Sequence, residues 1–199
     1  MTITAVLVAC LMGLSTTQSP APKSPPASKP STPQADSDAL QEFDTAVRDY
    51  MTLKTGLGGE VPPLVVTKDA ALIVARSDAL ARAIERGRVG AVRGEFFTAR
   101  VTALLRKRLS ALANHPDVRA TIAPAGEEKP TLGALRLHVR FPNGSTMPTM
   151  PTVLLDALPR IPASLEYRFI GTTLVLRDVE AALVLDFAPD VFPRAQKDK

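Results

Sequence analysis

Residues 165–187 read LEYRFIGTTLVLRDVEAALVLDF, and they decide the fold expected for this 199-residue chain. In the first five of them, apolar and charged side chains alternate, which is the period of a strand with one buried face. Gly171 permits a turn, and two more apolar runs follow at 174–176 and 183–187. The stretch therefore predicts neighbouring antiparallel strands.

A second alternation comes earlier in the chain, at 135–141. Four apolar residues are separated there by three basic ones, Arg136, His138 and Arg140. This period of two predicts a further half-buried strand, whose outer face is basic. Residues 142–144, Pro-Asn-Gly, then predict a turn.

Three helices are expected before these strands. The first spans about 38–55, with Asp38 as its N-cap and Gln41 completing a capping box. The second runs from a cap at Thr67 to Gly87. Its buried stripe is expected to contain Leu72, Ile73, Leu80, Ala83 and Ile84.

Thr98 is expected to cap a third helix that ends at Asn114, His115 and Pro116. A short helical piece is expected at 153–158. Together the patterns predict an α+β domain, with about three amphipathic helices packed on one face of a small antiparallel sheet of three to four strands. The other face of the sheet is expected to be polar and open to solvent.

The chain divides by composition. An uncharged apolar stretch from Ile3 to Leu14 is typical of an export signal, so residues 1–19 are assigned to a leader. Six of the fifteen residues from 19 to 33 are proline, so residues 20–36 are expected to be an extended linker. A single globular domain is expected at 37–193 and a flexible tail at 194–199. The apolar stretch is shorter than the roughly 20 residues of a membrane-spanning helix.

Two interpretations of the leader stay open, and they differ at Cys10. Leu7-Val8-Ala9-Cys10 resembles a bacterial lipobox, and cleavage before Cys10 would leave a lipidated N-terminus. An ordinary secretory signal cut between about Thr17 and Ala21 would instead remove Cys10. Either way we expect an exported protein, in the periplasm or on the outer surface, with Cys10 as its one route to a membrane anchor.

Composition excludes several chemistries. Cys10 is the only cysteine, so the folded part has no disulfide, no thiolate nucleophile and no cysteine-based zinc site. The two histidines, His115 and His138, show no metal-ligand spacing, so we expect no metal and no cofactor. Net charge is +4, and few aromatic residues are present to stack bases, so we expect no nucleic-acid partner.

Three constellations remain as candidate sites. The expected basic strand face, Arg136, His138 and Arg140 joined by Arg168 from a neighbouring strand, is suited to binding a carboxylate or phosphate. Arg106, Lys107 and Arg108 with Arg100 form a basic run on the third helix, which more simply is a solvated face because adjacent residues point in different directions. Paired acids hydrolyse glycosides, and three cluster around the last hairpin: Asp178, Glu180 and Asp186.

The stretches LEYRFIG (165–171) and LVLRDVE (174–180), with GEFFT (94–98) upstream, resemble a group of uncharacterised exported bacterial proteins. The resemblance covers mainly the C-terminal half. It implies export and carries no activity and no site residue.

The function expected from the sequence is therefore that of an exported cell-envelope protein. We expect a non-enzymatic binding or interaction module on a flexible stalk, whose partner is another envelope protein. Its contact surface is expected on the helix-free face of the sheet or between helices and sheet. The alternatives are a binder of small anionic ligands that uses the basic strand face, and a carboxylate-based hydrolase.

Overall fold

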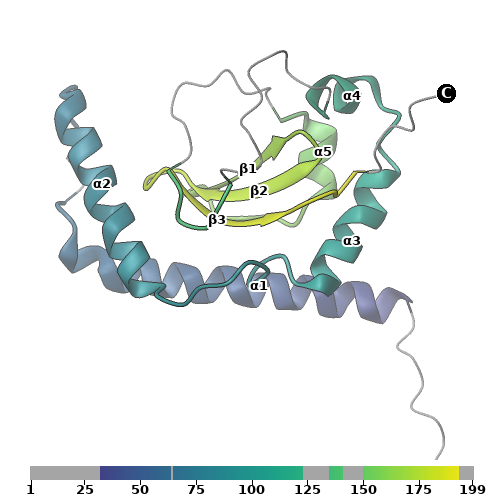
Figure 1. The fold of residues 1–199 in the computed structure, drawn as a ribbon, viewed down its shortest axis with the longest axis horizontal. Helices are drawn as coiled ribbons and strands as arrows, with labels where there is room; N and C mark the ends of the chain where they lie inside the picture. Colours follow the sequence, from purple (N-terminus) through teal and green to yellow (C-terminus); the bar gives the residue numbers. More distant parts are fainter. Residues whose placement is uncertain (1–31, 64, 123–134, 141–149, 193–199) are drawn as a thin grey trace, which may run out of the picture. The chain divides into compact units, whose positions relative to one another are not determined.

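The computed structural model describes residues 32–63, 65–122, 135–140 and 150–192, and the expected leader and tail lie outside these ranges. Within them, helices occupy the first part of the chain and strands the last part (Figure 1). This confirms the α+β class. The elements are α1 (Thr32–Gly56), η1 (Leu57–Glu60), α2 (Ala70–Gly87), α3 (Ala99–Ser110), α4 (Pro116–Ile122), α5 (Thr152–Ala157), β1 (Leu165–Ile170), β2 (Thr173–Asp178) and β3 (Leu183–Ala188).

The strands expected over 165–187 are confirmed. They form one antiparallel sheet in the order β1-β2-β3. Gly171 and Thr172 form the two-residue loop between β1 and β2, and Gly171 has a φ of +57°. Glycine with positive φ at the first loop position is typical of a type II′ hairpin, whose twist matches that of the strands.

β3 contains one irregularity. Leu176 of β2 pairs with Asp186, but the next residue, Arg177, pairs with Val184, so Leu185 is an extra residue in β3. Such a β-bulge interrupts the strict alternation of faces. Leu185 and Asp186, although consecutive, are therefore both fully buried.

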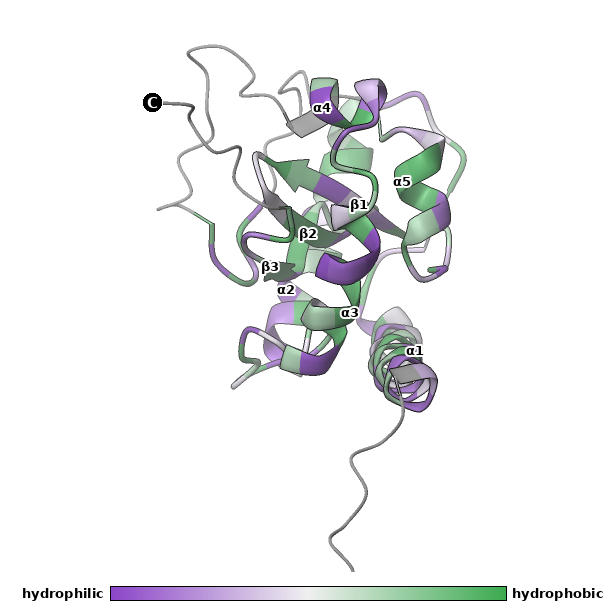
Figure 2. Ribbon diagram, turned by 90° about the vertical axis from the view of Figure 1, so that its right-hand side faces the viewer, coloured by the Kyte–Doolittle hydropathy of each residue, from purple (hydrophilic) through white to green (hydrophobic). Residues whose placement is uncertain are grey.

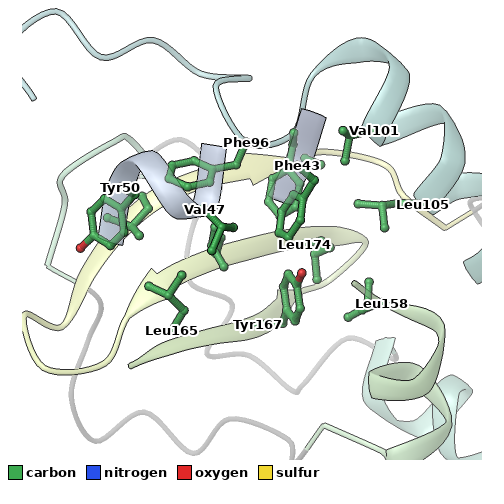
Figure 3. Close-up of a cluster of buried hydrophobic side chains, with 14 of the residues drawn as sticks. Phe43, Val47, Tyr50, Phe96, Val101, Leu105, Leu158, Leu165, Tyr167 and Leu174 are labelled. Atoms are coloured by element: carbon green, nitrogen blue, oxygen red, sulfur yellow. The ribbon is translucent and has the colours of Figure 1, made fainter. Parts of the chain in front are cut away.

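The main core lies between the sheet and the helices. α1 crosses one face of the sheet (Figure 1), and its buried residues recur every three or four positions: Ala39, Phe43, Val47 and Tyr50. Figure 3 shows Phe43, Val47 and Tyr50 meeting residues of the strands and of the segment before α3. The Phe43 ring lies 6.1 Å from that of Phe97 and 6.4 Å from that of Tyr167. In Figure 2 the strands are coloured largely as hydrophobic, whereas α1 mixes both colours, as expected for a helix with one buried stripe.

The opposite face of the sheet is not the open polar face expected from the sequence. Ile170, Val175 and Val184 are all buried there. They pack against partly buried apolar side chains, namely Leu135, Val139 and Phe187. The expectation is wrong because residues 135–139 lay apolar side chains over the sheet instead of adding a full strand to it.

The strand expected at 135–141 is likewise wrong over its described part, 135–140. Residues 137 and 138 form a turn, and His138 has a φ of +59°, in the left-handed region that strands do not use. Arg140 forms only an isolated bridge with Leu183. The alternation correctly indicated that apolar side chains such as Val139 are partly buried, but it did not determine the backbone path.

α1 begins at Thr32, before the expected cap at Asp38. Asp38 lies inside the helix and accepts a hydrogen bond from the Gln34 amide at 2.8 Å. Proline is tolerated in a first helical turn, so Pro33 does not prevent this start. An ion pair of 2.7 Å between Lys107 of α3 and Asp36 holds the added turn in place, so the end of the expected linker is helical.

The other caps are close to expectation. Thr98 caps α3 by accepting from the Val101 N–H at 3.2 Å, as predicted. Asp69 caps α2 by accepting from the Ala71 N–H at 2.9 Å, two residues after the predicted Thr67. The α2 stripe is buried as expected only in its second half; Leu72 and Ile73 are more than half exposed, because the first two turns extend past the core. α5 confirms the short helical piece.

Candidate functional site

Asp178, one of the three predicted hydrolytic acids, is fully buried beneath the sheet. Its carboxylate accepts hydrogen bonds from the Tyr50 hydroxyl at 2.8 Å, the Lys54 ammonium at 2.7 Å and the Ala181 N–H at 2.8 Å. Burial and the neighbouring Asp178 charge raise the pKa of Tyr50 far above its ordinary value, so Tyr50 keeps its proton as a donor. Asp178 therefore joins α1 to the end of β2.

Asp186, the second acid, is also fully buried. It accepts from three backbone N–H groups of the segment before α3, those of Gly94 at 3.0 Å and of Phe96 and Phe97 at 2.9 Å. A buried carboxylate is stable only when its lone pairs are satisfied. Asp186 does this with backbone donors, and so fixes the shape of residues 94–97 against β3.

Arg88 completes this polar layer. It is buried, donates to Glu95 at 2.6 Å, and lies over the rings of Tyr50 and Phe96 at 5.7 and 5.4 Å. Aromatic faces attract a guanidinium, which explains how this charge is accommodated in the core. Burial opposes ionisation of Glu95, but the hydrogen bonds from Arg88 and the Val92 N–H hold the pKa of Glu95 below its ordinary value.

The third acid, Glu180, lies at the surface and pairs with Lys54 at 3.5 Å and Arg76 at 3.7 Å. The two buried acids bind structural partners, and none of the three lines either of the hollows described below. The arrangement gives the hydrolase hypothesis no geometric support.

The four predicted basic residues do not converge. The Arg140 guanidinium contacts the carbonyls of Ser77 and Ala181 and the carboxylate of Asp78, beside β3. Arg168 is on β1, at the other edge of the sheet, and pairs with Glu166. Arg136 is exposed in the irregular segment. The shared face was expected from a strand that does not form.

His138, the remaining member of that set, faces Arg88, Glu85 and Glu95. Burial, and next the positive charge of Arg88, lower the pKa of His138, with the two glutamates opposing. Its Nε2 atom is buried and has no hydrogen-bond partner among the described residues. His138 is therefore held neutral in the fold.

The basic run on α3 is bound to neighbouring segments. Arg106 donates to the carbonyls of Asp190 and Pro189 at 2.9 and 3.0 Å. Arg108 donates to the Ala157 carbonyl at 3.4 Å, and Arg100 pairs with Glu42 at 2.7 Å. These contacts support the structural interpretation of the run.

Two surface hollows are described. One of about 480 Å³ follows α1 and is lined by residues of that helix alone, from Ser37 to Arg48. The other, the β1 hollow, has about 590 Å³ and lies between β1 and the segment around α5. It is lined by Met150, Leu155, Asp156, Pro159, Arg160, Ile161, Leu165, Glu166, Tyr167 and Arg168.

The most unusual surface is a set of exposed apolar residues at the start of α2 and in the segment before it. We call this set the α2 tip: Val65, Val66 and Leu72–Val74. Leu72, Ile73 and Val74 are 53%, 54% and 56% exposed, and Val65 is 57% exposed. In Figure 1 this end of α2 stands away from the other helices and strands. Sequence reasoning missed it, although the unbroken run of six apolar residues at 70–75 is not the pattern of a one-sided stripe.

Several site types are not seen in the part of the chain that the structure describes. No group of three or more histidine, cysteine or acidic side chains suited to a metal ion occurs there. No described helix is both long and apolar enough to cross a membrane. Comparisons with models of protein families, with curated proteins and with solved structures find no match to this chain.

We predict that Asp186→Asn destabilises the domain by about 2 kcal/mol or more, because it weakens charge-assisted bonds from three backbone N–H groups to a buried carboxylate. Urea unfolding followed by circular dichroism measures this. Asp156→Asn, on the exposed side of α5, is the matched control and should change stability by less than about 0.5 kcal/mol. Equal unfolding midpoints for D186N and the parent would contradict the assigned role.

We also predict that acid weakens the fold in two steps. His138 has a lowered folded pKa, so below its ordinary value of 6.5 the unfolded chain binds the proton first, and stability falls as pH drops through the folded pKa. The pKa of Glu95 in the folded state is also below its ordinary value of 4.5, so stability falls again as the pH drops below 4.5. Urea unfolding across pH should show that His138→Asn removes the first step and Glu95→Gln the second. An unchanged profile in H138N, with His115→Asn as control, would refute the first.

Proposed function

We propose that this chain is an exported envelope protein without enzymatic activity, which binds another protein through the α2 tip. The observation that carries this proposal is the exposure of three consecutive helical residues, Leu72, Ile73 and Val74. Residues 70–75 are all exposed, and neighbouring residues in a helix point about 100° apart, so no side of these first turns of α2 is covered by described residues. Exposed apolar clusters of this kind mark interaction surfaces.

The shape and charge of the tip favour a protein partner with an apolar groove. A helix that is apolar on several sides is best enclosed, as in helix-in-groove recognition. Lys68 and Asp69 come between the two apolar parts of the tip in the sequence; both are exposed, and Asp69 is the N-cap of α2. Insertion into lipid would bury both charges at high cost, whereas a groove open at its end leaves them in water.

The proposal of export depends on the leader and linker. The apolar stretch at 3–14 and the proline-rich segment that follows it come directly before α1. This order suits a folded module carried on a tether. The two alternatives have less support, since the basic residues are split between sheet edges and the acids bind structural partners.

The tip can be tested by placing a photo-crosslinking residue at Val74 in exporting cells. We expect one discrete adduct, lost when Leu72→Gln and Ile73→Gln are added, while the unfolding midpoint stays unchanged because both side chains are already exposed. The matched control is the same residue at Arg86, which is exposed on the same helix. Equal adducts from positions 74 and 86, or none from position 74, would contradict the proposal.

Export is tested by the intact mass of the protein recovered from its host after cell fractionation. We expect loss of the first nine residues with an acyl group on Cys10, or a new N-terminus at about residues 18–22. Cys10→Ser should release the protein from the membrane fraction in the first case and leave fractionation unchanged in the second. A chain that keeps Met1 in the cytosol would refute export.

A further inference from the structure

β1 is an edge strand in the part of the sheet that the structure describes, because it pairs there with β2 alone. The two-residue hairpin is closed by Ile170 and Thr173, and the Val179 N–H donates to the Ser164 carbonyl at 2.9 Å. Hydrogen bonding alternates along an antiparallel strand. The even-numbered residues of β1 therefore bond to β2, and the backbone groups of Leu165, Tyr167 and Phe169 point away from it. The Leu165 N–H already donates to the Pro162 carbonyl at 2.9 Å, so among the described residues the open part of the edge is the Leu165 carbonyl and the backbone groups of Tyr167 and Phe169.

The β1 hollow shows that this edge is accessible. Four consecutive residues, Leu165 to Arg168, line it. Successive side chains of a strand point to opposite faces of the sheet. Four consecutive residues can therefore line one hollow only if it runs along their backbone, at the edge of the sheet. The opposite wall includes Leu155, which is 47% exposed. The hollow is therefore a trough along an open strand edge with an uncovered apolar side chain beside it.

The sequence of β1 is suited to pairing with itself. A second β1 that pairs antiparallel with the first must place residues whose backbone groups point away from β2 opposite one another. Three registers do this while most of the two strands overlap. They are centred on Glu166, Tyr167 or Arg168. The first sets Glu166 against Glu166 and the third sets Arg168 against Arg168, and like charges directly opposite are destabilising.

The register centred on Tyr167 avoids both conflicts. It sets Glu166 of each copy opposite Arg168 of the other, and Leu165 opposite Phe169. Arg168 already pairs with Glu166 of its own chain, so in this register each of the four charges lies between two charges of opposite sign. Charge complementarity thus selects one register of the three.

We propose that two copies of this chain associate through β1, antiparallel and two-fold symmetric about Tyr167, so that the three described strands of each copy join into one continuous sheet. This surface is separate from the α2 tip. Leu72→Gln with Ile73→Gln should therefore leave association unchanged, so failure of one proposal does not remove the other.

The experiment uses charge complementation in sedimentation velocity of the full chain. The parent should dimerise in a concentration-dependent way. Arg168→Glu leaves two acids on each strand and Glu166→Arg leaves two bases, so each variant alone should dissociate about tenfold more readily. An equimolar mixture of R168E and E166R should recover association, because each strand then faces the opposite charges.

Recovery on mixing is the decisive readout. Each variant also loses the Glu166–Arg168 ion pair within its own chain. If that loss alone reduced association, mixing the two variants would not restore it. Circular dichroism confirms that both variants fold, and the double variant E166R/R168E should self-associate again. Arg86→Glu, an equal charge change on α2, is the control. A monomeric parent at every concentration, or no recovery in the mixture, would overturn the proposal.

Discussion

Two buried carboxylates on the strands, those of Asp178 and Asp186, connect the sheet to the helical half of this protein. Asp178 on β2 accepts from Tyr50 and Lys54 of α1, and Asp186 on β3 accepts from the backbone of residues 94–97. A buried charge is costly unless each oxygen is satisfied, and removing a partner is more costly still. These requirements tolerate little displacement of α1 or of the segment before α3, so they specify how the apolar surfaces meet.

The β-bulge in β3 makes this arrangement possible. Without the extra residue at Leu185, strict alternation would direct Leu185 or Asp186 to the other face of the sheet. With it, Leu185 fills the main core while Asp186 reaches the N–H groups above it. Arg88 then contacts the Leu185 carbonyl at 3.4 Å and the aromatic rings around it. Residues whose chemical type suggested catalysis are thus used to stabilise the fold.

Hydrogen bonds and ion pairs within the chain account for most of the charged clusters. Two surface features are not explained in this way. The α2 tip exposes apolar side chains, and the edge of β1 exposes backbone groups beside Leu155. The two proposed surfaces are suited to different kinds of partner. The tip needs an enclosing apolar groove, whereas the strand edge needs another strand with complementary charges at two positions. Both surfaces fit the role in assembly that we propose for this chain.

Local sequence was sufficient where neighbouring residues set the conformation. The alternation over 165–187, the glycine at 171 and the Thr98 cap each fix the backbone within a few residues, and each expectation is confirmed. Two caps differ from expectation: Asp69 and not Thr67 caps α2, and α1 begins before Asp38. At the start of α1, Asp36 pairs with Lys107, which is far away in the sequence.

By itself, the sequence therefore determined the class of fold, the three strands over 165–187 with the turn at Gly171, and the absence of cysteine chemistry from the folded part. Only the tertiary structure decided the path of residues 135–140, the cover on the second face of the sheet, and the roles of Asp178 and Asp186. The physical reason is that periodicity reports which side chains avoid water. Which surface buries them, and which donor satisfies a buried charge, depends on contacts between segments about 90 to 130 residues apart.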